Sequence, residues 1–189
     1  MTKQDYQITS WCRRLIRDHV HPGSFCIDAT MGNGNDTAWL CELAGSQGYV
    51  LAFDIQPQAI EQTHTRLEQQ QTDCPYELIL DSHSNMTNYA NADTADCIVF
   101  NLGYLPGGDH KIATKADTTI QALEQGLSLL RKNGLMSVCI YSGGDSGFDE
   151  RNAVLEWLKS LDSRKFLVLV TQYYNRPNNP PIPVAIIKL

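Results

Sequence analysis

The chain has 189 residues and a net charge of −6, and 42% of its residues are hydrophobic while 19% are charged. This composition is typical of a globular protein and excludes a disordered or collagen-like chain. No apolar run approaches the roughly 18 to 20 residues of a membrane span, and the opening residues lack the features of a signal peptide. We expect one domain over residues 1–189, located in the cytoplasm and without a membrane partner.

The charge balance and the cysteines exclude two further classes of protein. A net negative charge argues against a broad nucleic-acid surface, although it leaves room for a local basic patch. The six cysteines show no Cys-x-x-Cys pair and no spacing that gathers four metal ligands. Cys26, Cys97 and Cys139 lie in apolar runs, where a thiol behaves as a small hydrophobe. We therefore predict no metal site.

Apolar and helical segments alternate along the chain. An opening helix is expected near residues 4–19, followed by seven runs rich in apolar and β-branched residues. Continuous hydrophobicity indicates burial on both faces, which is typical of parallel strands covered by helices. The predicted strands cover residues 24–30, 49–55, 76–80, 96–102, 135–141, 166–174 and 183–189. Helices are predicted between them, the clearest over residues 57–71, 116–134 and 149–161.

This alternation predicts an α/β fold with a Rossmann-like, doubly wound sheet of seven strands. The last two strands are joined only by NRPNNPPI (175–182), which is too short for a crossover helix. The sheet should therefore be mostly parallel, with an antiparallel last strand.

The stretch DATMGNGND (28–36) follows the first strand, where doubly wound sheets bind ligands. Gly32 and Gly34 would let the backbone approach an adenosine cofactor, either a dinucleotide or S-adenosylmethionine. Thr37 occupies the place of the third glycine of a dinucleotide motif. Asp28 would repel a diphosphate but suits the sulfonium and ammonium of S-adenosylmethionine. The loop therefore favours S-adenosylmethionine as the cofactor.

The next two strands also end in polar residues. Asp54 could accept hydrogen bonds from the ribose hydroxyls, although dinucleotide sites use a similar acid. Asp81, Ser82 and His83 could lie at the adenine edge, or could cap the following helix. The full set of cofactor-binding candidates is Asp28, Met31, Gly32, Asn33, Gly34, Asn35, Asp36, Thr37, Asp54, Ile55, Gln56, Asp81, Ser82, His83 and Asn101.

The fourth strand runs into NLGYLPGGDH (101–110), which is similar to the site of amino-group methyltransferases. Those enzymes carry an Asp or Asn, two further residues and an aromatic. Asn101 and the backbone carbonyl of Leu102 could hold the N–H groups of an amine, and Tyr104 could stack on its base. Asp109 and His110 are further candidates for taking the released proton, as is Asp145, and no spacing selects among these three.

Together these motifs resemble class I S-adenosylmethionine-dependent methyltransferases, and more narrowly a small bacterial rRNA methylase family. Characterised members of that family are tRNA 5-(aminomethyl)-2-thiouridine methyltransferases. The resemblance implies methylation of the 5-aminomethyl group of a wobble uridine in tRNA, giving 5-methylaminomethyl. It rests on DATMGNGNDT (28–37), AFDIQ (52–56), NLGYLPGGDH (101–110), the helix at 114–134, YSGGDSG (141–147) and QYYNRPNNPP (172–181).

The remaining candidates form a substrate surface at the same edge of the sheet. Cations there could meet phosphates of the tRNA anticodon stem-loop, which position an RNA without specifying it. The substrate-binding candidates are Tyr104, Lys111, Lys115, Tyr141, Asp145, Arg151 and Arg176. The arginines of the opening helix, Arg13, Arg14 and Arg17, could extend the RNA surface or could simply be solvated, and we slightly favour the second interpretation.

Two other interpretations stay open. The chain could methylate rRNA or a small-molecule amine, or it could be a nucleotide-binding module without catalysis. The oligomeric state is undetermined, and a homodimer remains open.

Overall fold

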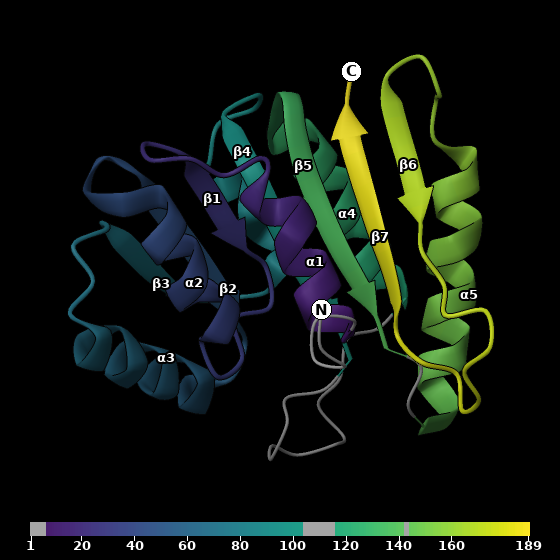
Figure 1. The fold of residues 1–189 in the computed structure, drawn as a ribbon, viewed down its shortest axis with the longest axis horizontal. Helices are drawn as coiled ribbons and strands as arrows, with labels where there is room; N and C mark the ends of the chain where they lie inside the picture. Colours follow the sequence, from purple (N-terminus) through teal and green to yellow (C-terminus); the bar gives the residue numbers. More distant parts are fainter. Residues whose placement is uncertain (1–6, 104–115, 142–143) are drawn as a thin grey trace.

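The computed structural model describes residues 7–103, 116–141 and 144–189, with residues 144–147 described by their backbone alone. A seven-stranded sheet forms the centre, in the order β3-β2-β1-β4-β5-β7-β6 (Figure 1). The strands are β1 (Phe25–Asp28), β2 (Tyr49–Asp54), β3 (Tyr76–Leu80), β4 (Ala95–Leu102), β5 (Leu130–Ile140), β6 (Phe166–Val170) and β7 (Ile182–Lys188). The helices are α1 (Ile8–Arg17), α2 (Asn35–Ala44), α3 (Pro57–Gln70), α4 (Ala116–Leu129) and α5 (Gly144–Ser160), with short 3-10 helices η2 (Gly45–Gln47) and η3 (His83–Asn88).

The pairing of the strands confirms the predicted fold class. The strands β1 to β5 pair in parallel, whereas β7 runs antiparallel to both of its neighbours, β5 and β6. The carboxyl ends of β1, β2, β4 and β5 therefore meet at one edge of the sheet, at the bottom of Figure 1.

Two buried clusters cover the two faces of the sheet. Because neighbouring strand residues point to opposite faces, Cys26 and Cys97 face α1, α2 and α3, while Ile27 and Ile98 face α4 and α5. All six cysteines are free and buried, which agrees with the prediction that Cys26, Cys97 and Cys139 act as small hydrophobes. Within the described residues, no helix is long and apolar enough to cross a membrane.

The boundary between α4 and β5 lies earlier than the sequence predicts. The helix ends at Leu129 and the strand begins at Leu130, whereas the sequence places the helix end near residue 134. The register with β4 shifts between Ala95 and Cys97, so the intervening residues of β5 bulge outward. Asn133 takes a positive φ of 63° there. The turn signals of RKNG thus belong to a bulge, because tertiary pairing with β4 overrides the local helix pattern.

Two further boundaries differ from the prediction. The helix α5 begins at Gly144, so part of YSGGDSG is helical where a loop is expected. The strand β6 ends at Val170, and residues 171–181 form an extended connector to β7. This connector, like α1, reaches the edge where the parallel strands end.

Candidate functional site

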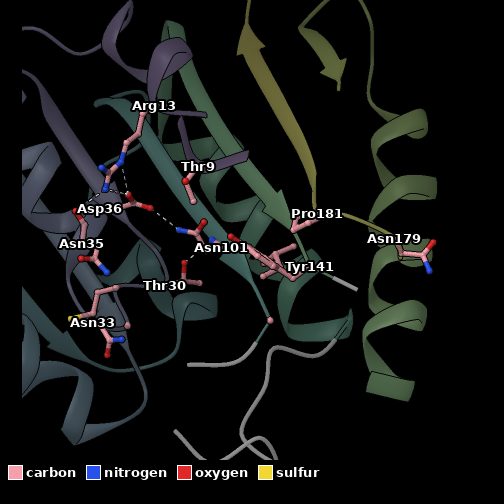
Figure 2. A pocket seen from close by; sticks show the side chains of 14 residues that line it. Thr9, Arg13, Thr30, Asn33, Asn35, Asp36, Asn101, Tyr141, Asn179 and Pro181 are labelled. Atoms are coloured by element: carbon pink, nitrogen blue, oxygen red, sulfur yellow. Dashed lines mark hydrogen bonds and ion pairs between the residues drawn. The ribbon is translucent and has the colours of Figure 1, made fainter. Parts of the chain in front are cut away.

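A cavity of 680 Å³ lies at the carboxyl edge of the sheet (Figure 2). Its wall combines the loop after β1, the end of β4 and the residue that follows β5 with residues of α1 and of the connector. The lining residues are Thr9, Arg13, Thr30, Met31, Gly32, Asn33, Asn35, Asp36, Asn101, Leu102, Gly103, Tyr141, Asn179 and Pro181. The structure thus brings eight predicted site residues together: Met31, Gly32, Asn33, Asn35, Asp36, Asn101, Leu102 and Tyr141.

The glycine loop is shaped by positive backbone angles and by two neighbouring side chains. Gly32 and Gly34 have φ values of 52° and 73°, a region that L side chains rarely adopt. The Gly32 N–H donates to Asp54 Oδ2 at 3.1 Å, and its carbonyl accepts from Thr63 Oγ1 at 3.2 Å. A Cβ on Gly34 would lie 2.7 Å from Thr63 Oγ1. The second glycine therefore serves packing against α3 and does not line the cavity.

Asp28 lies beneath the loop and exposes no surface. Its carboxylate accepts from Thr37 Oγ1 at 2.7 Å and from the Thr30 N–H at 3.2 Å. Thr37 is equally buried, so both side chains organise the loop, and their contact with the cofactor stays a prediction. Burial, and secondarily the charge of Asp36, raises the pKa of Asp28 to about 7.

The end of β2 contacts the glycine loop, and neither β2 nor β3 lines the cavity. Asp54 is half-buried and also accepts from the Gln56 N–H at 3.0 Å, while Ile55 is exposed. Burial raises the pKa of Asp54. Of the predicted residues at the ends of β2 and β3, Asp54 is the one that forms a hydrogen bond with the glycine loop.

The segment after β3 forms a capped 3-10 helix. Ser82 Oγ accepts from the Ser84 N–H at 3.2 Å, and Asp81 accepts from the Ser82 N–H and from Asn85. These hydrogen bonds are those of a helix cap, which is the second of the two roles that the sequence leaves open for Asp81 and Ser82. His83 contacts the Phe100 ring edge-on at 6.1 Å between centroids, and burial lowers its pKa.

Asn101 lies at the end of β4 and is held on both its backbone and its side chain. Its N–H donates to Thr30 Oγ1 at 2.7 Å, and its Nδ2 donates to Asp36 Oδ2 at 2.9 Å. The other oxygen of Asp36 accepts from Arg13 Nη2 at 3.0 Å and from Arg13 Nε at 3.3 Å (Figure 2). Three elements that are distant in sequence, α1, α2 and β4, thus meet at one polar cluster on the cavity wall.

Arg13 is a site residue that the sequence analysis misses. Its guanidinium also lies 5.0 Å from the centre of the Trp39 ring and donates to the Asn35 carbonyl at 3.3 Å. The contact with Asp36 joins residues 23 positions apart, so no local spacing pattern reveals it. The lining residues Thr9, Thr30, Gly103, Asn179 and Pro181 are also missed, although Thr30 and Gly103 lie within motifs that the sequence analysis identifies.

The predicted substrate surface is only partly described. Tyr141 lines the cavity, and burial raises its pKa. Arg151 is half-buried, and its Nε has no hydrogen-bond partner among the described residues. Arg176 is exposed, with its guanidinium 5.9 Å from the centre of the Tyr173 ring. Tyr104, Asp109, His110, Lys111 and Lys115 lie outside the described residues, as does the side chain of Asp145 in α5.

The three carboxylates around the glycine loop are each bound by protein groups. Asp28 lies buried under the loop, Asp54 accepts from two backbone N–H groups, and Asp36 on the cavity wall pairs with Arg13. Among the described residues, no group of three His, Cys, Asp or Glu side chains could hold a metal ion.

Comparison with known proteins identifies a matching family and related structures of about the same length as this chain. Residues 50–187 match the protein family described as "Putative rRNA methylase". The structure of a "putative rRNA-methylase" from Clostridium thermocellum shares 44% identity over 97% of this chain and 98% of its own, with a TM-score of 0.94. A "putative methyltransferase" from Streptococcus mutans, solved in complex with SAH, is 36% identical over the full length of both chains, with a TM-score of 0.88.

A plant protein extends the comparison. The chloroplastic tRNA (mnm(5)s(2)U34)-methyltransferase of Arabidopsis thaliana is 36% identical over 171 residues. The alignment covers 85% of this chain but only 62% of that longer relative. The resemblance to methyltransferases that the sequence motifs carry is confirmed, and the chain belongs to the rRNA methylase family with its class I S-adenosylmethionine-dependent methyltransferase fold.

Proposed function

We propose that this protein transfers a methyl group from S-adenosylmethionine to the 5-aminomethyl nitrogen of wobble 5-aminomethyl-2-thiouridine in tRNA. The observation that carries the proposal is Asn101, whose side chain lies on the wall of the cavity beside the glycine loop. Its Nδ2 is bound by Asp36, which leaves its oxygen available to accept an amine N–H. The related tRNA methyltransferase of Arabidopsis thaliana supports the choice of substrate.

The residues around the cavity suit S-adenosylmethionine. A volume of 680 Å³ is typical of a small-molecule or cofactor site. The backbone at Gly32 carries no side chain that would exclude the ligand. The related Streptococcus mutans methyltransferase, solved in complex with SAH, supports the same cofactor.

The reaction needs positioning more than proton chemistry. When bound, S-adenosylmethionine supplies a methyl group on sulfur, which the neutral amine takes by forming an N–C bond as the C–S bond breaks, releasing S-adenosylhomocysteine and then a proton to water. The Asn101 oxygen accepts one amine N–H. The Leu102 carbonyl, which already accepts from the Tyr141 N–H at 3.2 Å, has a second lone pair for the other, so that the nitrogen lone pair points at the methyl carbon. Correct alignment of two reactants of this kind accounts for a large share of the rate enhancement.

The connector before β7 is the described surface best suited to contact the anticodon stem-loop. Asn179 and Pro181 line the cavity, while Tyr174 and Arg176 of the same segment are exposed. A guanidinium can bind phosphate, and an aromatic ring can stack on an unpaired base. Tyr174 and Arg176 are therefore our candidates for contacting an RNA bound at the cavity. Lys111 and Lys115 remain sequence-based candidates for the same surface.

Mass spectrometry of nucleosides tests the reaction. Total tRNA and rRNA from cells with and without the gene would be digested and compared. We expect loss of 5-methylaminomethyl-2-thiouridine from tRNA and accumulation of the 5-aminomethyl precursor. Loss of a methylated nucleoside from rRNA alone would instead support the rRNA alternative, and unchanged RNA would support a small-molecule substrate.

Calorimetry tests the cofactor. The purified protein should bind S-adenosylmethionine and show no heat of binding with NAD. Binding of NAD without S-adenosylmethionine would contradict the proposal and favour a nucleotide-binding module.

Substitutions in the connector test the RNA surface. Replacing Tyr174 and Arg176 by Ala should weaken tRNA binding about tenfold or more, since each base stack is worth about 1 to 3 kcal/mol, and should leave S-adenosylmethionine affinity intact. Arg164→Ala is the matched control, because Arg164 is exposed and precedes β6 at the opposite edge of the sheet. Equal tRNA affinity in the connector variant and the control would exclude this surface.

A further inference from the structure

The amide of Asn101 has a defined orientation in the cavity wall. Its Nδ2 lies 2.9 Å from Asp36 Oδ2. An ionised carboxylate can only accept hydrogen bonds, so the NH₂ group must face Asp36 and the amide oxygen must point away from it. The Asn101 N–H is bound at the same time by Thr30 Oγ1 at 2.7 Å. Neither the backbone nor the side chain of Asn101 is free to turn.

Asp36 is held in turn by α1. Arg13 donates from Nη2 and Nε to Asp36 Oδ1, at 3.0 and 3.3 Å. The Arg13 guanidinium is itself fixed by the Trp39 ring and by the Asn35 carbonyl. Each carboxylate oxygen of Asp36 therefore has its own partner, Arg13 on one side and Asn101 on the other (Figure 2).

The direction of the amide matters for attack by an amine. An amide oxygen accepts an N–H of the amine and leaves the nitrogen lone pair free. If the amide turned by 180°, its NH₂ group would face the amine and would donate to that lone pair. A hydrogen-bonded lone pair cannot attack a methyl carbon, although the amine could still bind. The orientation of Asn101 should therefore govern turnover more than affinity.

We propose that Asp36 and Arg13 are positioning residues for methyl transfer. Asp36 keeps the Asn101 oxygen directed toward the target amine, and Arg13 keeps Asp36 in place. This inference rests on the proposed function, in which Asn101 accepts an N–H of that amine. It also gives α1, which lies outside the β-α pattern of the fold, a role in the reaction.

A double-mutant cycle tests whether Asp36 acts through Asn101. Single-turnover methylation of tRNA would be measured at saturating S-adenosylmethionine for D36N, N101A and the double variant. D36N allows either end of the Asn101 amide to face residue 36, so we expect its rate to fall about 10- to 100-fold. Its affinity for S-adenosylhomocysteine should stay within about threefold. In the N101A background, D36N should lower the rate by less than about threefold.

Two outcomes of the cycle would overturn the proposal. Rate losses that multiply fully in the double variant would mean that Asp36 acts independently of Asn101. A D36N defect that lies wholly in S-adenosylhomocysteine affinity would place Asp36 in the cofactor site alone.

Variants of Arg13 provide a second test that does not depend on the stability of D36N. R13M should slow methylation in the wild-type background and add little to the defect of N101A. R13K should restore part of the rate, because lysine keeps a positive charge beside the Asp36 carboxylate. R17A is the matched control, since Arg17 is exposed on the same helix, and should retain the wild-type rate. A wild-type rate for R13M would contradict the proposal.

The cycle also separates this inference from the proposed function. If N101A methylates tRNA at the wild-type rate, Asn101 is not the acceptor, and both proposals fail. If N101A is slow while D36N and R13M are fast, the acceptor stands and only the positioning role is wrong.

Discussion

Asp28 binds the Thr37 hydroxyl and the Thr30 N–H from a fully buried position between β1 and α2. Burial raises its pKa to about 7, above the ordinary value of an aspartate. The folded protein therefore binds more protons than the unfolded chain between about pH 4 and pH 7. The contribution of Asp28 to stability is largest below pH 4 and declines as the pH rises through 7.

The first prediction concerns this pH dependence. As the pH rises from 5 to 8, Asp28 loses its proton, and the free energy of unfolding of the ligand-free protein should fall by on the order of 2 kcal/mol. Asp28→Asn should remove that decline, as measured by denaturant unfolding at both pH values. Asp81→Asn is the control, because hydrogen bonds lower the pKa of Asp81 and keep it ionised over this range. An equal decline in the Asp28 variant and the wild type would contradict the assignment.

The second prediction concerns Gly34. Gly34→Ala adds a Cβ at 2.7 Å from Thr63 Oγ1 and keeps a φ of +73°. We expect a loss of about 2 to 4 kcal/mol in unfolding free energy, combining backbone strain with overpacking. Gly45→Ala meets nothing within 4 Å, and its φ of 63° and ψ of −172° lie in a region found almost exclusively for glycine, so its cost of about 1 to 3 kcal/mol is backbone strain alone. A loss at Gly34 no larger than the roughly 1 to 2 kcal/mol of left-handed backbone strain, measured by thermal unfolding, would show that Thr63 moves aside without cost.

At the scale of elements, α1 links the core to the cavity. Its buried residues Cys12 and Ile16 pack against the sheet at β5 and β7, while Thr9 and Arg13 line the cavity. Loosening the buried side of α1 should therefore also disturb the polar side. The same helix therefore contributes to the stability of the fold and to the position of Arg13.

The third prediction tests that link. Ile16 is 2% exposed, and Ile16→Ala should cost about 2 to 4 kcal/mol of unfolding free energy through the cavity it leaves. The rate of tRNA methylation should fall with it, even at temperatures where the variant is folded. Leu80→Ala removes a side chain that is 55% exposed and should change stability by less than about 0.5 kcal/mol. Full activity in a destabilised Ile16 variant would separate α1 packing from catalysis.

The sequence predicts elements better than the contacts between them. All seven strands are found, because runs such as YVLAFDI are apolar enough to show burial on both faces. The end of α4 is misplaced, because RKNG reads locally as a helix stop while pairing with β4 extends β5 back to Leu130. The glycine loop and Asn101 lie at one cavity, at the edge of the sheet where their motifs place them. The position of Arg13 at this cavity is not predicted, because it depends on where α1 docks.

The charge of the whole molecule limits how it would bind the proposed RNA substrate. A net charge of −6 repels a polyanion outside the immediate contact surface. Binding should therefore rely on few phosphate contacts and on recognition of the target base. Such binding differs from that of proteins with a broad basic face.

The fourth prediction expresses this as a salt dependence. With three to five phosphate contacts, log K for tRNA plotted against log salt concentration should have a slope between about −2 and −4. Affinity for S-adenosylhomocysteine should change little over the same range of salt concentration, so the slope can be attributed to tRNA binding. A slope near −7 or steeper would reveal a much larger cationic surface.

The order of the strands has a consequence for biosynthesis. The strand β7 is the last of the seven along the chain, yet it lies between β5 and β6. Until Ile182–Lys188 leave the ribosome, β5 has one open edge and β6 has no partner strand. Synthesis at about 5 to 20 residues per second leaves those edges exposed for a second or more after β6 is made. The nascent chain is thus most open to mispairing and to chaperones just before its sheet can close.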